Sequence, residues 1–444
     1  MTFHPSKSHE PNSPISDPIA VHPNAWRWVL AAIMVLAVIA RLAFSLGISR
    51  GLLHIQPELE STDNYHLIAR SLFEGHGYRF SADGSPATQR APAYPAFLLA
   101  IFSIAGVDYV WVQVAQALLG ALGCWLLFLL GRWVLSNELG LAAAALYAIY
   151  PNSIEYSARL YSENVYFPIF LAFSYLLCRA SFEGSTRRGL AAGAAWGASL
   201  LTRGTLLALP FALPIGIALS RTHRSPRFRW LRWAMPALLA GVLVVAPWAA
   251  RNYALTGAFV PVSTWGWAPI YHGTQVAKRM NEWVDLQSVD IAASQHVRDV
   301  FNQQSQNGNA SESAGARAVR YDQLAKKLTL ADWSSDPLGM VGRAVAGLGY
   351  AWFFTFGAKL RVLSLATHLP LFVLFVLGAV TMARKYREAF IRAWPALGLI
   401  LYVNLFQAVA YPHVRYMAPS IALSFLFSAL PLVGLSRWLV NRRT

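Results

Sequence analysis

Residues 61–80 read STDNYHLIARSLFEGHGYRF, and residues 90–99 read RAPAYPAFLL. These two segments lie between strongly apolar stretches of the chain. In the first segment, Tyr65, Ile68 and Leu72 recur at the spacing of an amphipathic helix lying at a membrane surface. A short loop rich in carboxylates, arginines and aromatic residues therefore interrupts membrane-spanning segments, and the fold prediction is built outward from it.

Bulk composition places the whole chain in a membrane. Of its 444 residues, 56% are hydrophobic and only 13% are charged, whereas soluble proteins average about 45–50% apolar residues. The formal net charge of +16 comes largely from arginines in short loops between apolar stretches, where they set orientation in the membrane. We therefore expect membrane lipids as partners and no nucleic acid. The two cysteines, Cys124 and Cys178, lie inside apolar stretches and indicate no disulfide framework.

Ten apolar stretches are predicted to span the membrane, although several are shorter than the roughly 20 residues that a crossing needs. The sequence thus predicts an all-α integral membrane protein with about ten or more transmembrane helices, interfacial juxtamembrane helices and a small extracytoplasmic subdomain. The ten stretches are residues 26–48, 109–134, 140–150, 166–180, 189–202, 205–220, 233–250, 363–383, 393–411 and 417–440.

Arginine-rich loops predict the orientation. Residues 221–232 carry five arginines and residues 384–392 carry three arginines and a lysine, and short basic loops face the cytoplasm. This places both termini in the cytoplasm. The predicted divisions are a disordered tail at 1–25, an N-terminal catalytic membrane module at 26–250 with a first extracytoplasmic loop at 49–95, an extracytoplasmic subdomain at 251–342, and C-terminal membrane helices at 343–444.

Charged residues gather at the predicted outer ends of the spans. The acids are Asp63, Glu155 and Glu163, and the bases include Arg90, Arg203, Arg251 and Arg415. Taken singly, the acids also fit helix starts, with Thr62 or Asp63 as a helix cap, and the arginines fit interfacial anchors. Together they suit transfer of a group from a lipid phosphate, because arginines bind the departing phosphate and a carboxylate deprotonates an incoming hydroxyl.

Other chemistries find little support in the sequence. It contains no HExxH, CxxC, Walker or GxSxG motif. Several histidines are nevertheless predicted on the outer face, so a divalent-metal site assembled from loops stays open. These histidines are His54, His66, His76, His272 and His413.

Several motifs in chain order resemble those of the GT-C membrane glycosyltransferases. They are TDNYHLIAR, GHGY and RAPAYPAFLLAIF in the first loop, then LYSENVYFPIFLAF, PWAARNYALTGAFVPVSTWGWAPIYHG, DPLGMVGRAVAGLGYAWFF and HVRYMAP. The resemblance is closest to the bacterial branch of protein O-mannosyltransferase-like enzymes, the lipid A aminoarabinose transferase and the core galacturonosyltransferases. Two departures stand out: Ala91 replaces a frequent proline, and Asn64 stands where mannosyltransferases have the second acid of an Asp-Glu pair.

This resemblance implies a polyprenyl-phosphate sugar as donor and inversion at the anomeric carbon. By its motifs, Asp63 is the general base and Glu163 a second acid, while Arg90, Arg251 and Arg415 bind the donor phosphate. Further residues expected in the cavity are Tyr65, Tyr94, Glu155, Asn252, His413 and Tyr416.

The same resemblance implies a lipid, glycan or protein acceptor and an active site on the periplasmic or exterior face of the cell inner membrane. A surface-polysaccharide polymerase or ligase and a transporter or flippase for lipid-linked sugars stay as alternatives. The sequence identifies neither the sugar nor the acceptor.

The predicted orientation is testable by labelling. A cysteine introduced at Ser288 or Ser311 should react with an impermeant thiol reagent added from outside the cytoplasm, whereas one at Ser225 should react only after the membrane is opened. The opposite labelling pattern would overturn the orientation.

Overall fold

The structure is a computed structural model that describes residues 24–49, 63–212, 230–280, 286–306, 312–353 and 358–441. Nearly all of these residues are helical, and the described part of the chain contains no β-strand beyond a single bridge between Arg79 and Pro86. The predicted all-α class is confirmed. The predicted tail, the basic loop at 221–229 and the three C-terminal residues lie outside the described residues.

The helices follow one another with short connections. Their bounds are α1 Ala25–Ser49, α2 Tyr65–Phe73, α3 Ala93–Ala105, α4 Tyr109–Val134, α5 Asn137–Ala148, α6 Pro151–Ala158, α7 Glu163–Glu183, α8 Thr186–Leu200, the 3-10 turn η1 Gly204–Leu206, α10 Leu231–Thr256, α11 Trp267–Lys278, α12 Leu286–Gln306, α13 Ala314–Ser335, α14 Pro337–Phe353, α15 Ala358–Lys385, α16 Arg387–Ala410 and α17 Val414–Asn441.

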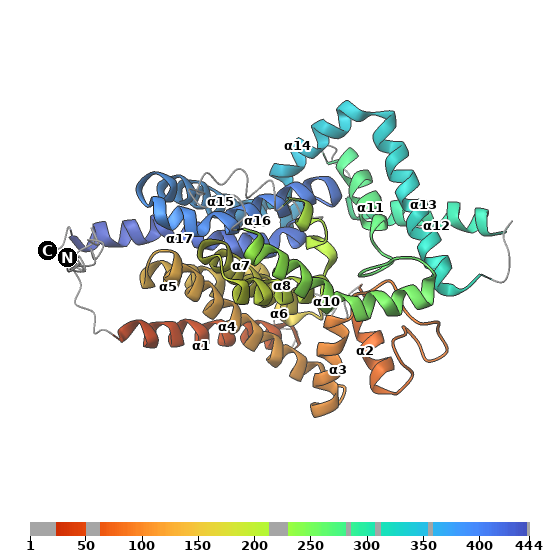
Figure 1. Cartoon of the computed structure of the whole chain (residues 1–444), viewed down its shortest axis with the longest axis horizontal. Helices are drawn as coiled ribbons and strands as arrows, with labels where there is room; N and C mark the ends of the chain where they lie inside the picture. The colour runs from red at the N-terminus through yellow and green to blue at the C-terminus, as the bar shows by residue number, and fades with distance from the viewer. Residues whose placement is uncertain are drawn as a thin grey trace, which may run out of the picture.

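Seven of the described helices, α1, α4, α7, α10, α15, α16 and α17, are long and apolar enough to cross a membrane. Each coincides with a predicted span. The predicted spans at 140–150 and 189–202 correspond to the shorter helices α5 and α8, and the one at 205–220 begins with η1 and continues beyond the described residues. Helix α1 begins and α17 ends at one end of the bundle, while α2, α3 and α11–α13 lie at the other (Figure 1).

Small residues let two of these helices approach closely. Helix α8 carries Gly189, Gly193 and Gly197 at four-residue intervals, facing α10. A Cβ atom at Gly193 would lie 1.9 Å from the backbone oxygen of Ala237, so no larger residue fits there. This spacing is the small-residue pattern by which membrane helices pack backbone against backbone.

One charged side chain, Arg41 of α1, is buried within the bundle. Its guanidinium donates to the backbone oxygens of Ala148 (3.2 Å) and Tyr147 (3.4 Å), at the C-terminal end of α5. It also donates to Ser153 Oγ at 2.8 Å. The last carbonyls of a helix lack partners within the helix and carry partial negative charge. Arg41 therefore caps α5 from a neighbouring helix.

The helices α11–α13 have a hydrophobic cluster of their own, separate from the main core of the bundle. Tyr271, Val297 and Leu324 belong to this cluster. It meets the bundle where α11 packs on the end of α16, so closely that a Cβ at Gly273 would lie 2.0 Å from the Ala410 backbone oxygen. We call α11–α13 the external unit.

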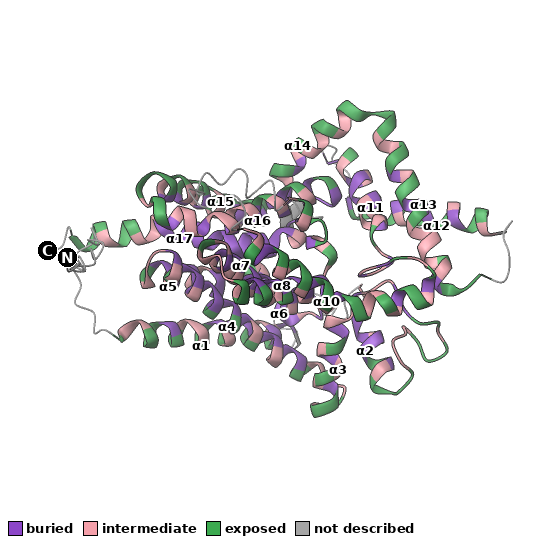
Figure 2. Cartoon of the chain, viewed as in Figure 1, coloured by how far each residue is buried: buried purple, intermediate pink, exposed green. Residues whose placement is uncertain are grey.

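Helix α14 joins the external unit to the bundle and has an exposed apolar face. Leu338 is 84% exposed, and Val341 and Val345 are exposed as well. Figure 2 shows this exposed surface on α14 beside the buried centre of the bundle. An apolar face of this kind suits the membrane interface, as predicted for the juxtamembrane helices.

The first residues of α11 are held by the Asp322 carboxylate of α13. Its Oδ1 accepts hydrogen bonds from the backbone N–H groups of Gly266, Trp267 and Ala268 at 3.0, 2.7 and 3.2 Å. Asp322→Ala should lower the free energy of unfolding by roughly 1–2 kcal/mol, since it removes this cap. Asp322→Asn keeps an acceptor and should lose less. Thermal unfolding of the two variants in detergent would measure this, and equal losses would contradict the cap.

Candidate active site

A cavity of about 530 Å³ opens where the first loop, the end of α16 and the start of the external unit meet. One part of its wall is polar and contains Asp63, Arg90 and Arg203. The rest is largely apolar and aromatic. Its members include Leu207, Ala208, Phe211, Val262, Trp265, Trp267, Ile270, Phe406 and Ala410. The cavity therefore combines a charged end with an extended apolar surface.

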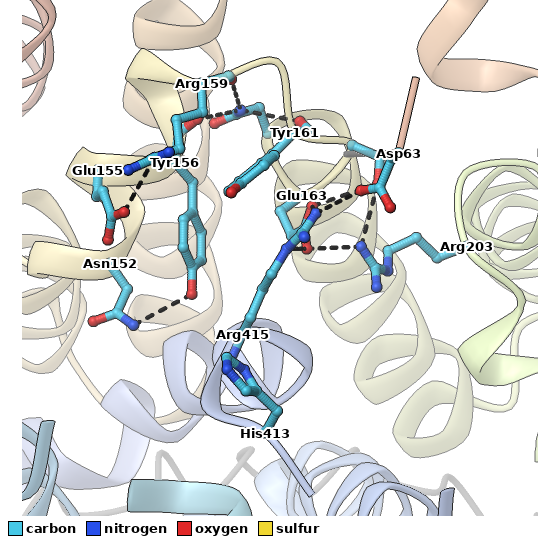
Figure 3. A network of polar contacts seen from close by, with 12 residues as sticks. Asp63, Asn152, Glu155, Tyr156, Arg159, Tyr161, Glu163, Arg203, His413 and Arg415 are labelled. Carbon is cyan, nitrogen blue, oxygen red and sulfur yellow. Dashed lines mark hydrogen bonds and ion pairs between the residues drawn. The ribbon is translucent and has the colours of Figure 1, made fainter. Parts of the chain in front are cut away.

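Arg415, at the start of α17, joins the two predicted catalytic acids. Its Nη2 lies 2.8 Å from Asp63 Oδ2, and its Nε lies 2.5 Å from Glu163 Oε1. The Tyr161 ring lies against the guanidinium, with the Arg415 Cζ 3.8 Å from the ring centroid. Figure 3 shows Arg415 reaching between the two carboxylates. Residues 63, 163 and 415 thus meet in one ion-paired cluster, although they are far apart in the sequence.

Glu163 is the buried member of this cluster. It is 1% exposed, and its Oε1 also lies 2.7 Å from Arg203 Nη1. Glu163 does not line the cavity, whereas Arg203 does. The geometry gives Glu163 the position of a fixed counter-charge that holds Arg203 and Arg415 in place.

Asp63 is more accessible and lines the cavity, with its side chain 30% exposed. Burial alone would raise the pKa of Asp63, but the charges of Arg415, Arg90 and Arg203 outweigh it and hold this pKa below the ordinary value. Asp63 is therefore a carboxylate at neutral pH. The alternative of Asp63 or Thr62 as a helix cap is wrong for Asp63, because α2 begins after Asn64, a left-handed residue with φ 58°, and has no side-chain cap.

Arg90 also lines the cavity but is held by neutral groups. Its Nε donates to the Asp63 backbone oxygen at 2.8 Å, and Nη1 donates to the Gln89 backbone oxygen at 3.3 Å. Its guanidinium lies over the rings of Tyr65 (5.9 Å) and Trp265 (5.5 Å). Within the described residues, no carboxylate forms an ion pair with Arg90.

Arg251 has a separate set of contacts. Its guanidinium lies over the Trp248 and Tyr78 rings, and Nη2 donates to the Ala87 backbone oxygen at 3.0 Å. Its neighbour Asn252 is fully buried and donates to backbone oxygens of the segment that follows α10. Neither residue lines the cavity, and none of the contacts of Arg251 with described residues is with Arg415.

The other predicted cavity residues fall into two groups. Tyr65 and Tyr416 line the cavity. Tyr94 is buried and donates to Gln116 Oε1 at 2.7 Å, and Glu155 of α6 pairs with Arg159, which follows that helix (Figure 3). His413 is buried, and its Nδ1 accepts from the Arg415 backbone N–H at 3.0 Å. Burial and the Arg415 charge lower the His413 pKa to about 3, so this ring is neutral and positions the start of α17.

Most of the other lining residues were not predicted from the sequence, among them Gln407, Tyr411 and Trp265. A signal existed for Gln407, which is an amide within the apolar stretch at 393–411. Arg203 was recognised as an outer base but not assigned to the site. Nothing in the local sequence of Trp265 indicated that its loop folds back over the first loop.

A divalent metal was left open by the sequence. The described residues contain no group of three His, Cys, Asp or Glu side chains placed to hold one. Asp63, which lines the cavity, and Glu163 behind it are engaged by arginines. His272 lies 3.5 Å from Asp290 in the external unit, and His54 lies outside the described residues.

The fold can now be compared with known folds. An all-helical membrane bundle with acids and arginines at one end, capped by a small external unit, has the GT-C fold. Residues 89–250, less than half of the chain, match the family model of dolichyl-phosphate-mannose-protein mannosyltransferases. No curated protein matches the sequence.

Among solved structures, the archaeal oligosaccharyltransferase AglB of Archaeoglobus fulgidus, in complex with an inhibitory peptide and a dolichol-phosphate, matches with 16% identity and a TM-score of 0.56. The match covers 94% of this chain and 52% of AglB, so the chain spans about half the length of that protein. ArnT of Cupriavidus metallidurans, bound to undecaprenyl phosphate, is 14% identical over 92% of this chain and 78% of ArnT, with a TM-score of 0.43.

The role of Glu163 as a buried counter-charge is testable through stability. Glu163→Gln leaves Arg203 and Arg415 without their shared partner, and breaking a buried ion pair costs roughly 3–5 kcal/mol. Glu155→Gln is the matched control, because Glu155 is 42% exposed and, among the described residues, its one ion pair is with Arg159. Thermal unfolding in detergent should show a large loss for the first variant and little change for the second. Equal stability of both variants would contradict this role.

Proposed function

We propose that the protein is a glycosyltransferase that moves a monosaccharide from a polyprenyl-phosphate donor to an acceptor hydroxyl at this cavity. The observation that carries the proposal is the presence of Asp63, Arg90 and Arg203 in one cavity whose remaining wall is apolar. A lipid-linked phosphate needs both kinds of surface. The fold, shared with an oligosaccharyltransferase solved with a dolichol-phosphate, supports it.

The donor fits the cavity in one orientation, with its phosphate at the charged end and its polyprenyl chain along the apolar wall. Arg90 and Arg203 are the lining cations, and arginine forks bind phosphate oxygens through paired N–H groups. The apolar lining continues from Leu207 to Phe211 and across to Phe406 of α16, which gives the polyprenyl chain a surface next to the spans. Arg415, expected earlier to bind the phosphate, is assigned a positioning role instead, and Arg251, expected there as well, is given no role in the reaction.

Asp63 is the base of the proposed reaction. Its carboxylate accepts the proton of the acceptor hydroxyl as that oxygen forms a bond to the anomeric carbon. The bond from this carbon to the phosphate oxygen breaks, and the electron pair stays on the polyprenyl phosphate. Arg90 and Arg203 stabilise the added negative charge. One displacement inverts the anomeric carbon, as the sequence resemblance implies.

Arg415 keeps Asp63 aligned for this step. One guanidinium holds Asp63 and the buried Glu163 together, so the Asp63 carboxylate has a fixed position at the cavity wall. The acceptor class, lipid, glycan or protein, and a site facing the periplasm or exterior of the inner membrane remain parts of the proposal. A lipid-sugar flippase gains no support, because Arg41, a charged residue buried within a described span, is bound to backbone carbonyls.

Substitution of the base tests the proposal. Asp63→Asn keeps the shape but cannot accept the proton, so turnover should fall by roughly 10²–10⁴ while the protein stays folded. Single-turnover transfer from a panel of polyprenyl-phosphate sugars to membrane extracts would measure this. Arg251→Lys is the control and should retain most activity, because Arg251 does not line the cavity. Near-normal turnover by Asp63→Asn would contradict the assignment of Asp63 as the base.

A further inference from the structure

We infer that the sugar on the donor is neutral, and that it is neither a uronic acid nor an amino sugar. This inference rests on the proposed function, since it concerns the same cavity. It follows from how the charged groups around the cavity are already paired.

The cations leave one positive charge for the ligand. Among the described residues, three arginines, Arg90, Arg203 and Arg415, stand at the charged end, against the two carboxylates of Asp63 and Glu163. Arg203 and Arg415 are held by those carboxylates, and Arg90 is the lining arginine that forms no ion pair with any described residue. A sugar linked through a lipid phosphodiester carries one negative charge on its phosphate. That charge offsets the single net positive charge of these described groups, so no described cation is left over for the carboxylate of a uronic acid.

The carboxylates around the cavity are occupied too. Asp63 and Glu163 face Arg415, as described above. Asp290 of α12 accepts a hydrogen bond from Tyr411 Oη at 2.9 Å, and it also lies 3.5 Å from His272 Nδ1. Asp322 Oδ1 accepts from three backbone N–H groups of the segment that begins α11. Among the described residues near the cavity, an ammonium group of an amino sugar therefore meets only carboxylates that already have partners.

The rest of the polar lining is uncharged. It consists of Gln89, Thr202, Thr205, Ser263, Gln407, Tyr411 and Tyr416, with Trp265 and Trp267 beside them. The side-chain amide of Gln407 forms no hydrogen bond with a described residue, so both its N–H donors and its oxygen are available to sugar hydroxyls. Amides and hydroxyls bind neutral hydroxyl groups well, whereas an unpaired charge brought into a partly buried cavity loses its hydration without compensation. The lining therefore favours a neutral sugar.

Binding to the full chain in lipid nanodiscs tests the inference. The probes share one polyprenyl chain and carry mannose, galacturonate, 4-amino-4-deoxyarabinose or no sugar on the phosphate. We expect the neutral-sugar lipid to bind about tenfold or more tightly than either charged-sugar lipid, because the charged sugars lack a partner. A charged-sugar lipid that binds as tightly as the neutral one, or more tightly, would overturn the inference. Binding of the sugar-free lipid phosphate in that case would leave the proposed function intact, whereas failure of every probe to bind would refute both.

Matched charge variants sharpen the result. Ser263 lines the cavity from a loop and is only partly buried. Ser263→Arg should improve binding of the galacturonate lipid relative to the mannose lipid, and Ser263→Glu should do the same for the aminoarabinose lipid. Each variant is the control for the other, because both place a long charged side chain at the same position. If neither substitution changes the order of preference, the inference that cavity charge selects the sugar is wrong.

Discussion

The position of the Arg415 guanidinium between Asp63 and Glu163 is the constraint on which the rest of the site depends. It joins the first loop, the start of α7 and the start of α17 through ion pairs of 2.8 and 2.5 Å. Separately buried, each of these charges would be costly, but together they compensate one another. The cluster also fixes Arg203 through Glu163. One group of charges therefore holds in place both Asp63, the proposed base, and Arg203, at the proposed phosphate-binding end of the cavity.

The external unit completes the cavity from the other side. Its own hydrophobic cluster keeps α11–α13 together, and the close contact of Gly273 with Ala410 seats it on the end of α16. Through this contact Trp265 reaches Arg90, and Tyr411 reaches Asp290. Membrane helices thus supply the ionic groups, while the external unit supplies much of the neutral and aromatic lining.

Local signals in the sequence were enough to predict the spans and the acids. Apolar length revealed α1, α4 and α7, and the carboxylate of Glu163 at the start of an apolar stretch indicated a special environment. The partners of these side chains across the fold could not be predicted. Arg251 and Arg415 look alike in the sequence, because each is an arginine at the end of a span. Only packing shows that Arg251 lies against Trp248 and Tyr78 whereas Arg415 meets two carboxylates. The lining residue Trp265 was missed for the same reason, since a loop folds back over distant residues without a local signal.

Arg41 has a consequence for biosynthesis. Helix α1 is the first described span, and the residues that bind its arginine, Tyr147, Ala148 and Ser153, follow about a hundred positions later. A lone arginine at the centre of a span raises the cost of insertion by roughly 2.5–3.5 kcal/mol. While the ribosome is still making α4 and α5, the first span therefore carries a charge without these partners. Its stable integration into the bilayer is coupled to the arrival of α5 and α6, so the N-terminal helices assemble as one group and not one at a time.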